Sequence, residues 1–271
     1  MKASKRLQRS AWILALSISG AGLFAQTATD TFKPTVGQAG KDVVWVPSPQ
    51  TLVDRMLDMA KVTPQDYVID LGSGDGRTVI TAAQRGATAL GIEYNPDMVT
   101  LSQRNAKEAG VTAKATFVKA DIFESDFSKA TVITMFLLPD INVRLRPKIL
   151  DLKPGTRIVS NTFTMGDWQA DETVNLGNDC QSWCTALFWL VPAKVQGTWK
   201  MPAGELALTQ QYQMVTGTLN SGGKALPISE GRLRGEQLTF TAGGVQYTGR
   251  VTGNTIEGTG GAGGAWRAAR S

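Results

Sequence analysis

Residues 68–77, with the sequence VIDLGSGDGR, constrain the fold of this chain more than any other segment. A short apolar run ends at Leu71, and glycines then occupy every second position, at Gly72, Gly74 and Gly76. Glycine accepts backbone conformations that other residues avoid, and it lets the main chain approach a ligand closely. A buried strand that leads into such a loop predicts an α/β fold with a ligand at the carboxyl end of the strand.

The glycine spacing and the neighbouring acids narrow the choice of ligand. A dinucleotide-binding turn has the pattern G-x-G-x-x-G, whereas here the third glycine comes one residue early and Arg77 takes the place that it would need. Asp70 and Asp75 flank the loop. Carboxylates repel a pyrophosphate, but they attract a ligand that carries a sulfonium and an ammonium group. The segment therefore predicts a loop that binds S-adenosylmethionine.

Two further acids follow the next two apolar runs, Glu93 in GIEYNP and Asp121 in KADIF. A carboxylate at the position of Glu93 accepts hydrogen bonds from ribose hydroxyls in nucleotide-binding βαβ folds. Asp121 is expected to accept from the adenine amino group, with the amide of Ile122 donating to the ring. Taken singly, either acid reads more simply as a solvated loop residue or a helix cap. The predicted cofactor-binding residues are Asp70, Leu71, Gly72, Ser73, Gly74, Gly76, Glu93, Asp121 and Ile122.

Strand and helix patterns alternate between residues 67 and 191. Strands are predicted at 67–71, 89–93, 115–119, 131–138, 157–163, 173–176 and 185–191, and helices at 52–60, 77–85, 96–109 and 142–152. Several of the strands are apolar without alternation, which is typical of strands covered on both faces. The pattern predicts a seven-stranded, mostly parallel, Rossmann-like sheet with a late antiparallel hairpin. We assign residues 46–195 to this domain.

The pattern changes after Pro192. Helical periodicity stops, and alternating stretches appear at residues 206–215, 238–242 and 245–251, separated by glycine-rich turns. Short strands between closely spaced turns predict a small antiparallel β module over residues 196–271, as a meander or a barrel. The module contains no catalytic constellation, so it is expected either to bind a partner or to stabilise the chain.

The N-terminus has the pattern of a secretory signal. A basic stretch precedes an apolar run at residues 11–24, which is shorter than the ~20 residues that span a bilayer. We therefore expect a signal peptide at residues 1–25, a flexible lead-in at 26–45, and export to the periplasm or envelope. The alternative is a membrane anchor with a cytoplasmic domain. The predicted signal peptide contains four basic residues and no acid, and the rest of the chain has 24 basic and 23 acidic residues. This near-neutral charge gives no electrostatic reason to expect binding of nucleic acid.

Histidine is absent and only two cysteines are present. Histidine-based catalysis and histidine- or cysteine-based metal sites are therefore excluded, and no metal is expected. Cys180 and Cys184 either form a disulfide, as export would allow, or stay free. The tryptophans at positions 183, 189, 199 and 266 are expected in the core rather than in a stacking platform.

Several segments resemble one family. VIDLGSGDGR, GIEYNP, MFLLPDIN, LKPGTRIVSN and MGDW are similar to segments of the small class I methyltransferases that include the mitochondrial lysine methyltransferases of the ATP synthase c-subunit and of the adenine nucleotide translocase. The resemblance covers about residues 45–195. It implies S-adenosyl-L-methionine as cofactor and N-methylation of a protein lysine, so the implied partner is a protein substrate.

The resemblance also implies that the VPSP and Leu-Leu-Pro segments form the wall of the methyl-transfer site, which makes Pro47, Ser48, Leu138 and Pro139 the substrate-channel candidates. The chain lacks the Asp/Asn-Pro-Pro-Tyr/Phe tetrad of the methyltransferases that act on amino groups of nucleic acids, and the corresponding residues read Leu-Leu-Pro-Asp. This difference counts against an adenine or cytosine acceptor. The SNTF segment departs from the relatives, which leaves the acceptor open.

The expected reaction needs few protein groups, because a sulfonium methyl is already activated and requires mainly alignment and exclusion of water. No general base is identifiable in the sequence. Asp140 and Asn161 are weak candidates for orienting the acceptor, and capping or turn roles suit them better. Two other functions stay open: a small-molecule methyltransferase, and an exported, non-catalytic binding protein on the same scaffold.

Overall fold

The computed structural model describes residues 32–177, 180–202, 204–260 and 264–271. The predicted signal peptide at residues 1–25 and the first part of the predicted lead-in lie outside the described residues. In the described part of the chain, no helix is long and apolar enough to cross a membrane.

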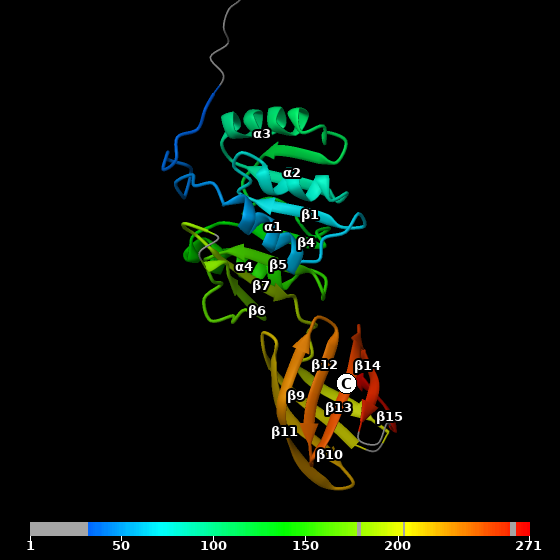
Figure 1. The fold of residues 1–271 in the computed structure, drawn as a ribbon. Coiled ribbons are helices and arrows are strands. Elements are labelled where there is room, and N and C mark those ends of the chain that lie inside the picture. Colours follow the sequence, from blue (N-terminus) through cyan, green and yellow to red (C-terminus); the bar gives the residue numbers. More distant parts are fainter. Residues whose placement is uncertain (1–31, 178–179, 203, 261–263) are drawn as a thin grey trace, which may run out of the picture. The chain divides into compact units, whose positions relative to one another are not determined.

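Seven strands form one sheet in the order β3-β2-β1-β4-β5-β7-β6. The strands are β1 (Tyr67–Leu71), β2 (Thr88–Glu93), β3 (Ala115–Lys119), β4 (Val132–Met135), β5 (Arg157–Asn161), β6 (Glu172–Asn175) and β7 (Thr185–Leu190). The pairs β1–β2, β1–β4, β2–β3 and β4–β5 are parallel, while β7 is antiparallel to both neighbours. The predicted sheet with its late antiparallel hairpin is confirmed (Figure 1).

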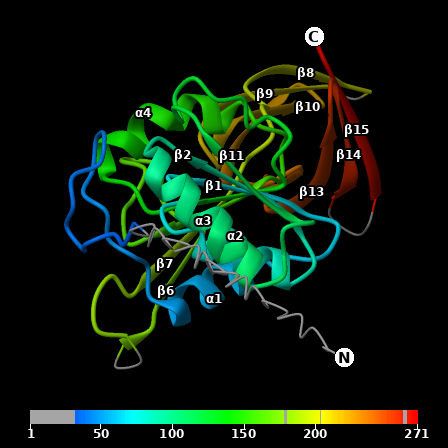
Figure 2. The same cartoon turned by 90° about the horizontal axis from the view of Figure 1, so that it is seen from above.

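Helices cover both faces of this sheet (Figures 1 and 2). One apolar core packs α1 (Gln50–Met59), α2 (Arg77–Gln84) and α3 (Pro96–Glu108) against one face. A second core packs α4 (Pro139–Leu150) against the other. Neighbouring residues of one strand alternate between these cores, as Val68 and Ile69 do, because successive side chains of a strand point to opposite faces.

Three element boundaries at the carboxyl edge of the sheet differ from the prediction by two or three residues. The strand predicted at residues 131–138 ends at Met135, and the helix predicted at 142–152 starts at Pro139. Proline is well tolerated in the first turn of a helix, where its missing N–H would have no partner in the helix. The strand predicted at 157–163 ends at Asn161, because Thr162 has a φ of 60°.

The C-terminal residues form a closed antiparallel barrel in the order β10-β11-β12-β13-β14-β15-β8-β9. Its strands are β8 (Gly197–Met201), β9 (Gly204–Gln211), β10 (Met214–Ser221), β11 (Lys224–Arg234), β12 (Gln237–Ala242), β13 (Val245–Thr252), β14 (Thr255–Gly260) and β15 (Gly264–Arg270). Alternating residues such as Leu238 and Phe240 fill its interior. The predicted all-β module is thus confirmed as a barrel, and partner binding by it stays a prediction.

The alternating stretch at residues 206–215 proves to be two strands, not one. A turn at Tyr212 and Gln213 separates β9 from β10, and Tyr212 has a φ of 53°. The turn is held from outside the barrel, because Tyr212 stacks on Trp168 and donates a hydrogen bond to Asp167. No glycine, proline or asparagine marks this turn in the sequence, so the alternation concealed it.

Candidate cofactor and acceptor site

The glycine loop begins where β1 ends, as the sequence predicts. Gly72, Gly74 and Gly76 have φ values of 78°, 54° and 84°, all in the left-handed region that favours glycine. The amides of Gly72 and Ser73 donate to the carbonyl of Ile92 on β2. A Cβ added at Gly74 would lie 2.7 Å from Nε1 of Trp45, so the loop has room only for glycine there. These contacts fix a bare stretch of backbone at the edge of the sheet.

Glu93 at the end of β2 holds this loop in place. One carboxylate oxygen accepts from the Gly74 amide at 2.9 Å, and the other accepts from the Asn95 amide at 2.9 Å. Asn95 in turn caps α3, because its side chain accepts from the Asp97 amide at 2.9 Å. A carboxylate oxygen has lone pairs beyond those used here, so Glu93 can still accept from two neighbouring hydroxyls of a ligand.

Asp70 is a buried acid beneath the loop. Its carboxylate accepts a hydrogen bond from Thr134 Oγ1 at 2.6 Å. Burial above all, with the charges of Glu93 and Asp75, raises the pKa of Asp70 to about 7, against the lowering effect of the Thr134 hydrogen bond. A buried acid among other acids favours a cationic ligand, because a positive charge would stabilise its ionised form.

Asp121, beyond the end of β3, forms an ion pair with a lysine from the N-terminal segment. The Lys41 ammonium donates to its carboxylate, and the same ammonium lies 4.8 Å from the centre of the Tyr94 ring. The hydrogen bond from Lys41, followed by that from the Phe123 amide, holds the pKa of Asp121 below its ordinary value. Ile122 lines the same pocket. The Asp121 carboxylate is therefore in place as a hydrogen-bond acceptor.

Residues 38–48 line the cofactor pocket, although most of them belong to the predicted flexible lead-in. Two backbone hydrogen bonds, Gly37 N to Trp45 O and Trp45 N to Gln38 O, close this segment on itself. Trp45 lies against Gly74. The apolar run at residues 43–46, Val-Val-Trp-Val, is the sequence signal that this segment packs on the site.

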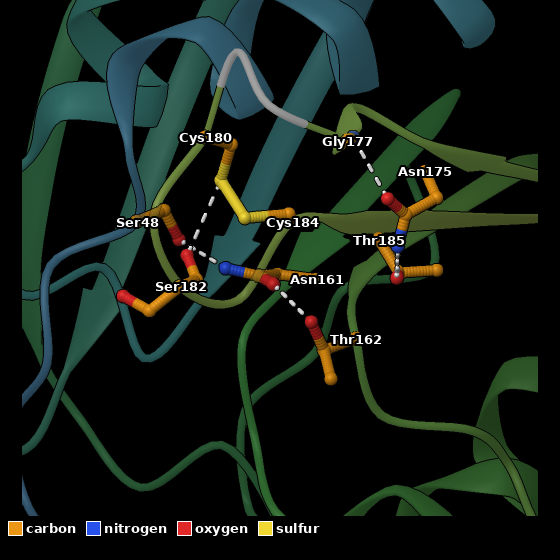
Figure 3. Close-up of a disulfide and its surroundings, with 9 residues drawn as sticks. All are labelled: Ser48, Asn161, Thr162, Asn175, Gly177, Cys180, Ser182, Cys184 and Thr185. Carbon is orange, nitrogen blue, oxygen red and sulfur yellow. Dashed lines mark hydrogen bonds between the residues drawn. A yellow bond between two sulfur atoms is a disulfide. The ribbon is translucent and has the colours of Figure 1, made fainter.

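Arg77 links the loop to the segment before α1. Its guanidinium pairs with Asp75 at 2.6 Å and donates to the carbonyl of Ser48 at 2.7 Å. The Ser48 hydroxyl accepts from Asn161 Nδ2 at 2.9 Å, and Figure 3 shows these two side chains facing each other. Asn161 is fully buried at the end of β5. The structure therefore brings two predicted candidates, Ser48 and Asn161, together.

Beyond Ser48 the pocket is lined by three aromatic rings, which we call the aromatic wall: Phe136, Phe163 and Trp183. Their ring centres lie 5.4–5.8 Å apart. They come from the ends of β4 and β5 and from the residues before β7, so they share one edge of the sheet with the glycine loop. The pocket has a volume of about 270 Å³ and joins the loop to the wall.

Some predicted site residues do not line this pocket. The side chain of Leu71 is buried in the apolar core, and Gly76 packs against Ser102 and Phe117. Pro139 and Asp140 are exposed in the first turn of α4. Of the channel candidates, Pro47, Ser48 and Leu138 do line the pocket.

Sequence reasoning missed the aromatic wall. Trp183 was expected in the core but is 39% exposed, whereas Trp189 and Trp199 are fully buried as expected. The loop that carries it is closed by a disulfide between Cys180 and Cys184, so the question of pairing that the sequence left open is answered. The close spacing of these cysteines around a tryptophan was the available signal.

The site fits S-adenosylmethionine. Gly74 leaves no room for a side chain, Asp70 is a buried carboxylate suited to an ammonium, and Glu93 and Asp121 follow the next two strands with acceptor atoms for ribose and adenine. Together with the strand order, these features define a class I methyltransferase fold.

Comparisons with known proteins agree with this class. Residues 70–172 match the model of the ANTKMT methyltransferase domain. The chain is 45% identical to a protein-lysine N-methyltransferase of Saccharolobus islandicus over 137 residues, which are 49% of this chain and 85% of that protein. It is 32% identical to the human lysine N-methyltransferase of the ATP synthase c-subunit, over 64% of this chain and 75% of that protein.

A solved structure gives a further match. The crystal structure of an RNA methyltransferase from Salinibacter ruber in complex with S-adenosyl-L-homocysteine is 47% identical, covers 55% of this chain and 96% of that chain, and has a TM-score of 0.52. The chain belongs to the methyltransferase family of these relatives, and it is an S-adenosylmethionine-dependent methyltransferase.

Proposed function

We propose that this enzyme is a protein-lysine N-methyltransferase. The observation that carries the proposal is the apolar acceptor end of the pocket, where the aromatic wall and Leu138 lie beyond the cofactor loop. Such a surface suits the long aliphatic stem of a lysine. The names of the archaeal and human relatives support the same acceptor. The name of the solved relative makes RNA the competing acceptor, and the near-neutral charge of the body counts against it.

The chain contributes alignment and desolvation. S-adenosylmethionine, when bound, would supply a methyl group on a positively charged sulfur. The lysine arrives as an ammonium and must first give one proton to solvent, because only the neutral amine has a lone pair, and loss of hydration in the apolar pocket lowers the pKa of the ammonium and favours this loss. The neutral amine would then take the methyl group and become a methylammonium, and the sulfur would remain as a neutral thioether. The Ser48 oxygen already accepts from Asn161 and can accept a second hydrogen bond, from the acceptor N–H. This bond would direct the nitrogen lone pair toward the methyl group.

We further propose that the protein is exported by a signal peptide and acts in the periplasm or envelope. The basic and apolar N-terminal pattern supports export. The disulfide between Cys180 and Cys184 supports it as well, because disulfides persist in oxidising compartments. Cell fractionation with N-terminal sequencing tests this proposal. A mature chain that starts near residue 26 in the periplasmic fraction is expected, whereas an uncleaved chain facing the cytoplasm would contradict it.

The acceptor is tested with S-adenosylmethionine that carries a labelled methyl group. The purified enzyme is incubated with envelope extract, and the label is measured separately in protein, RNA and small molecules. We expect label in protein, at lysine when the labelled peptides are sequenced by mass spectrometry, and none with Glu93→Ala. Label confined to RNA or to metabolites would contradict the proposal and identify the true acceptor class.

A further inference from the structure

We propose that the aromatic wall recognises the cationic side chain of the acceptor, and that the Cys180–Cys184 disulfide holds Trp183 in the wall. The inference rests on the proposed lysine acceptor. It names Phe136, Phe163 and Trp183 as the residues that select a cation over a neutral side chain of the same shape.

The first observation is the position of Trp183. Trp183 is 39% exposed, so much of its apolar surface is in contact with water. Burial of this surface would stabilise the folded state. Its φ of 56° places a bulky residue in the left-handed region, which such residues rarely adopt. Neither feature favours the folded state, and unfavourable backbone conformations are concentrated at functional sites.

The second observation is an independent strained turn that presents Phe163. Thr162 has a φ of 60°, although it is β-branched, and the Phe163 amide donates to the Asn161 carbonyl at 2.6 Å. This three-residue turn is rare and strained. It is fixed by hydrogen bonds from the Thr162 amide to the Thr185 carbonyl at 2.7 Å and from Ser160 Oγ to the Phe163 carbonyl at 2.7 Å.

The three rings form an apolar surface in the pocket that Ser48 also lines. Phe136 and Phe163 are stacked with 18° between their planes, and Trp183 meets Phe136 at 61°. Figure 3 shows the disulfide loop beside the Ser48–Asn161 pair. An ammonium within about 6 Å of an aromatic ring centre is attracted by the ring electrons, and tryptophan gives the strongest attraction. A lysine that enters as an ammonium and moves along this wall toward Ser48 would meet these rings before it loses its proton for methyl transfer.

The disulfide confines the loop that carries Trp183. Cys180 and Cys184 close a loop of five residues, and Cys184 directly precedes β7, which begins at Thr185. One end of the loop is thus fixed to the sheet and the other end is tied back to it. Without the covalent link, Trp183 would have to keep its left-handed conformation through its ring contacts alone. The disulfide therefore positions a residue of the wall.

The test compares a cation with its neutral isostere. The methylamides of Nα-acetyl-lysine and of N-acetyl-2-aminoheptanoic acid, whose side chain ends in a methyl group where lysine has its ammonium, are titrated into the enzyme saturated with S-adenosylhomocysteine, and binding is followed by NMR. We expect the lysine compound to bind about tenfold more tightly than the aminoheptanoic acid compound. Trp183→Leu should remove this preference and Trp183→Phe should restore most of it. Gln181→Ala, an exposed neighbour in the same loop, should leave it unchanged.

A second measurement uses methyl transfer to the same lysine compound. Trp183→Leu and the double variant Cys180→Ser/Cys184→Ser should raise the KM for the lysine compound about tenfold and leave the affinity for S-adenosylhomocysteine unchanged, which also reports that both variants are folded. Equal binding of the lysine and aminoheptanoic acid compounds to the wild type, or an unchanged KM in the variants, would overturn the inference. If the wild type selects the lysine compound but methylates no lysine, the proposed function fails while the recognition by the wall stands.

Discussion

The two halves of the pocket are built differently, although they share one edge of one sheet. The cofactor half uses a glycine loop and three acids, Asp70 in β1, Glu93 at the end of β2 and Asp121 beyond β3, so it presents backbone and carboxylates to a ligand. The acceptor half uses aromatic and polar side chains near the ends of β4, β5 and β7. The difference suggests that one half holds a fixed cofactor while the other sets the acceptor.

The largest expected effect is in the cofactor half. Glu93→Ala removes the carboxylate that accepts from the amides of Gly74 and Asn95. Hydrogen bonds to charged groups contribute about 1.5–3 kcal/mol each, so we expect the affinity for S-adenosylhomocysteine to fall at least ~100-fold. Calorimetric titration measures this, with Glu108→Ala at the exposed end of α3 as the control. Tight binding by Glu93→Ala would mean that the loop does not depend on this acid.

The second effect is a pH dependence of cofactor binding. The pKa of Asp70 is raised to about 7 by burial, so the free enzyme carries a protonated Asp70 at lower pH. A ligand ammonium requires the ionised form, and binding below pH 7 must therefore release a proton. We expect the affinity for S-adenosylhomocysteine to fall about tenfold per pH unit below pH 7 and to level off above it.

The control for this pH dependence is Asp70→Asn, which has no titrating group at that position. Its affinity should be lower at pH 8 and nearly constant between pH 6 and pH 8. A wild-type affinity that does not change over this range would show that the ligand ammonium does not contact Asp70.

In the acceptor half, Ser48→Ala removes the hydroxyl beside Asn161. One hydrogen bond contributes about 1 kcal/mol, so kcat for methyl transfer should fall about fivefold while the affinity for S-adenosylhomocysteine stays the same. Steady-state kinetics with a lysine acceptor measures the change, and Thr51→Ala on the exposed side of α1 serves as the control. An equal loss of cofactor affinity would place Ser48 in the cofactor half instead.

The smallest effect concerns Lys41, which pairs with Asp121 at the adenine end. The pair is partly exposed, and such pairs contribute little to stability. Lys41→Met leaves Asp121 available to the adenine amino group, so the affinity for S-adenosylhomocysteine should rise by no more than about threefold. A clear fall in affinity would show instead that Lys41 contacts the ligand.

The same contrast explains what the sequence could predict. The glycines, Glu93 and Asp121 are recognisable because each sits directly after an apolar strand, and parallel strands end at one edge. The mostly parallel sheet and the all-β module followed from element patterns in the same way. Phe136, Phe163 and Trp183 come from three distant segments, and only the packing of β4, β5 and β7 brings them together.

Local backbone strain hid the remaining features. Thr162, Trp183 and Tyr212 all adopt positive φ without being glycine, so no residue preference marks their turns. The segment that carries Lys41 and Trp45 has a short apolar run at residues 43–46 after polar residues and glycines, and it lacks helical or strand periodicity, so its pattern predicts a flexible lead-in. Its contacts with Asp121 and Gly74 depend on tertiary structure alone.

The most direct test of two separable halves is one calorimetric series with S-adenosylhomocysteine as the ligand. The wild type, Glu93→Ala and Trp183→Leu are titrated side by side at pH 8. We expect tight binding by the wild type, the same affinity in Trp183→Leu, and a loss of at least ~100-fold in Glu93→Ala. No binding by the wild type, or an equal loss in both variants, would contradict a cofactor half that works independently of the aromatic wall.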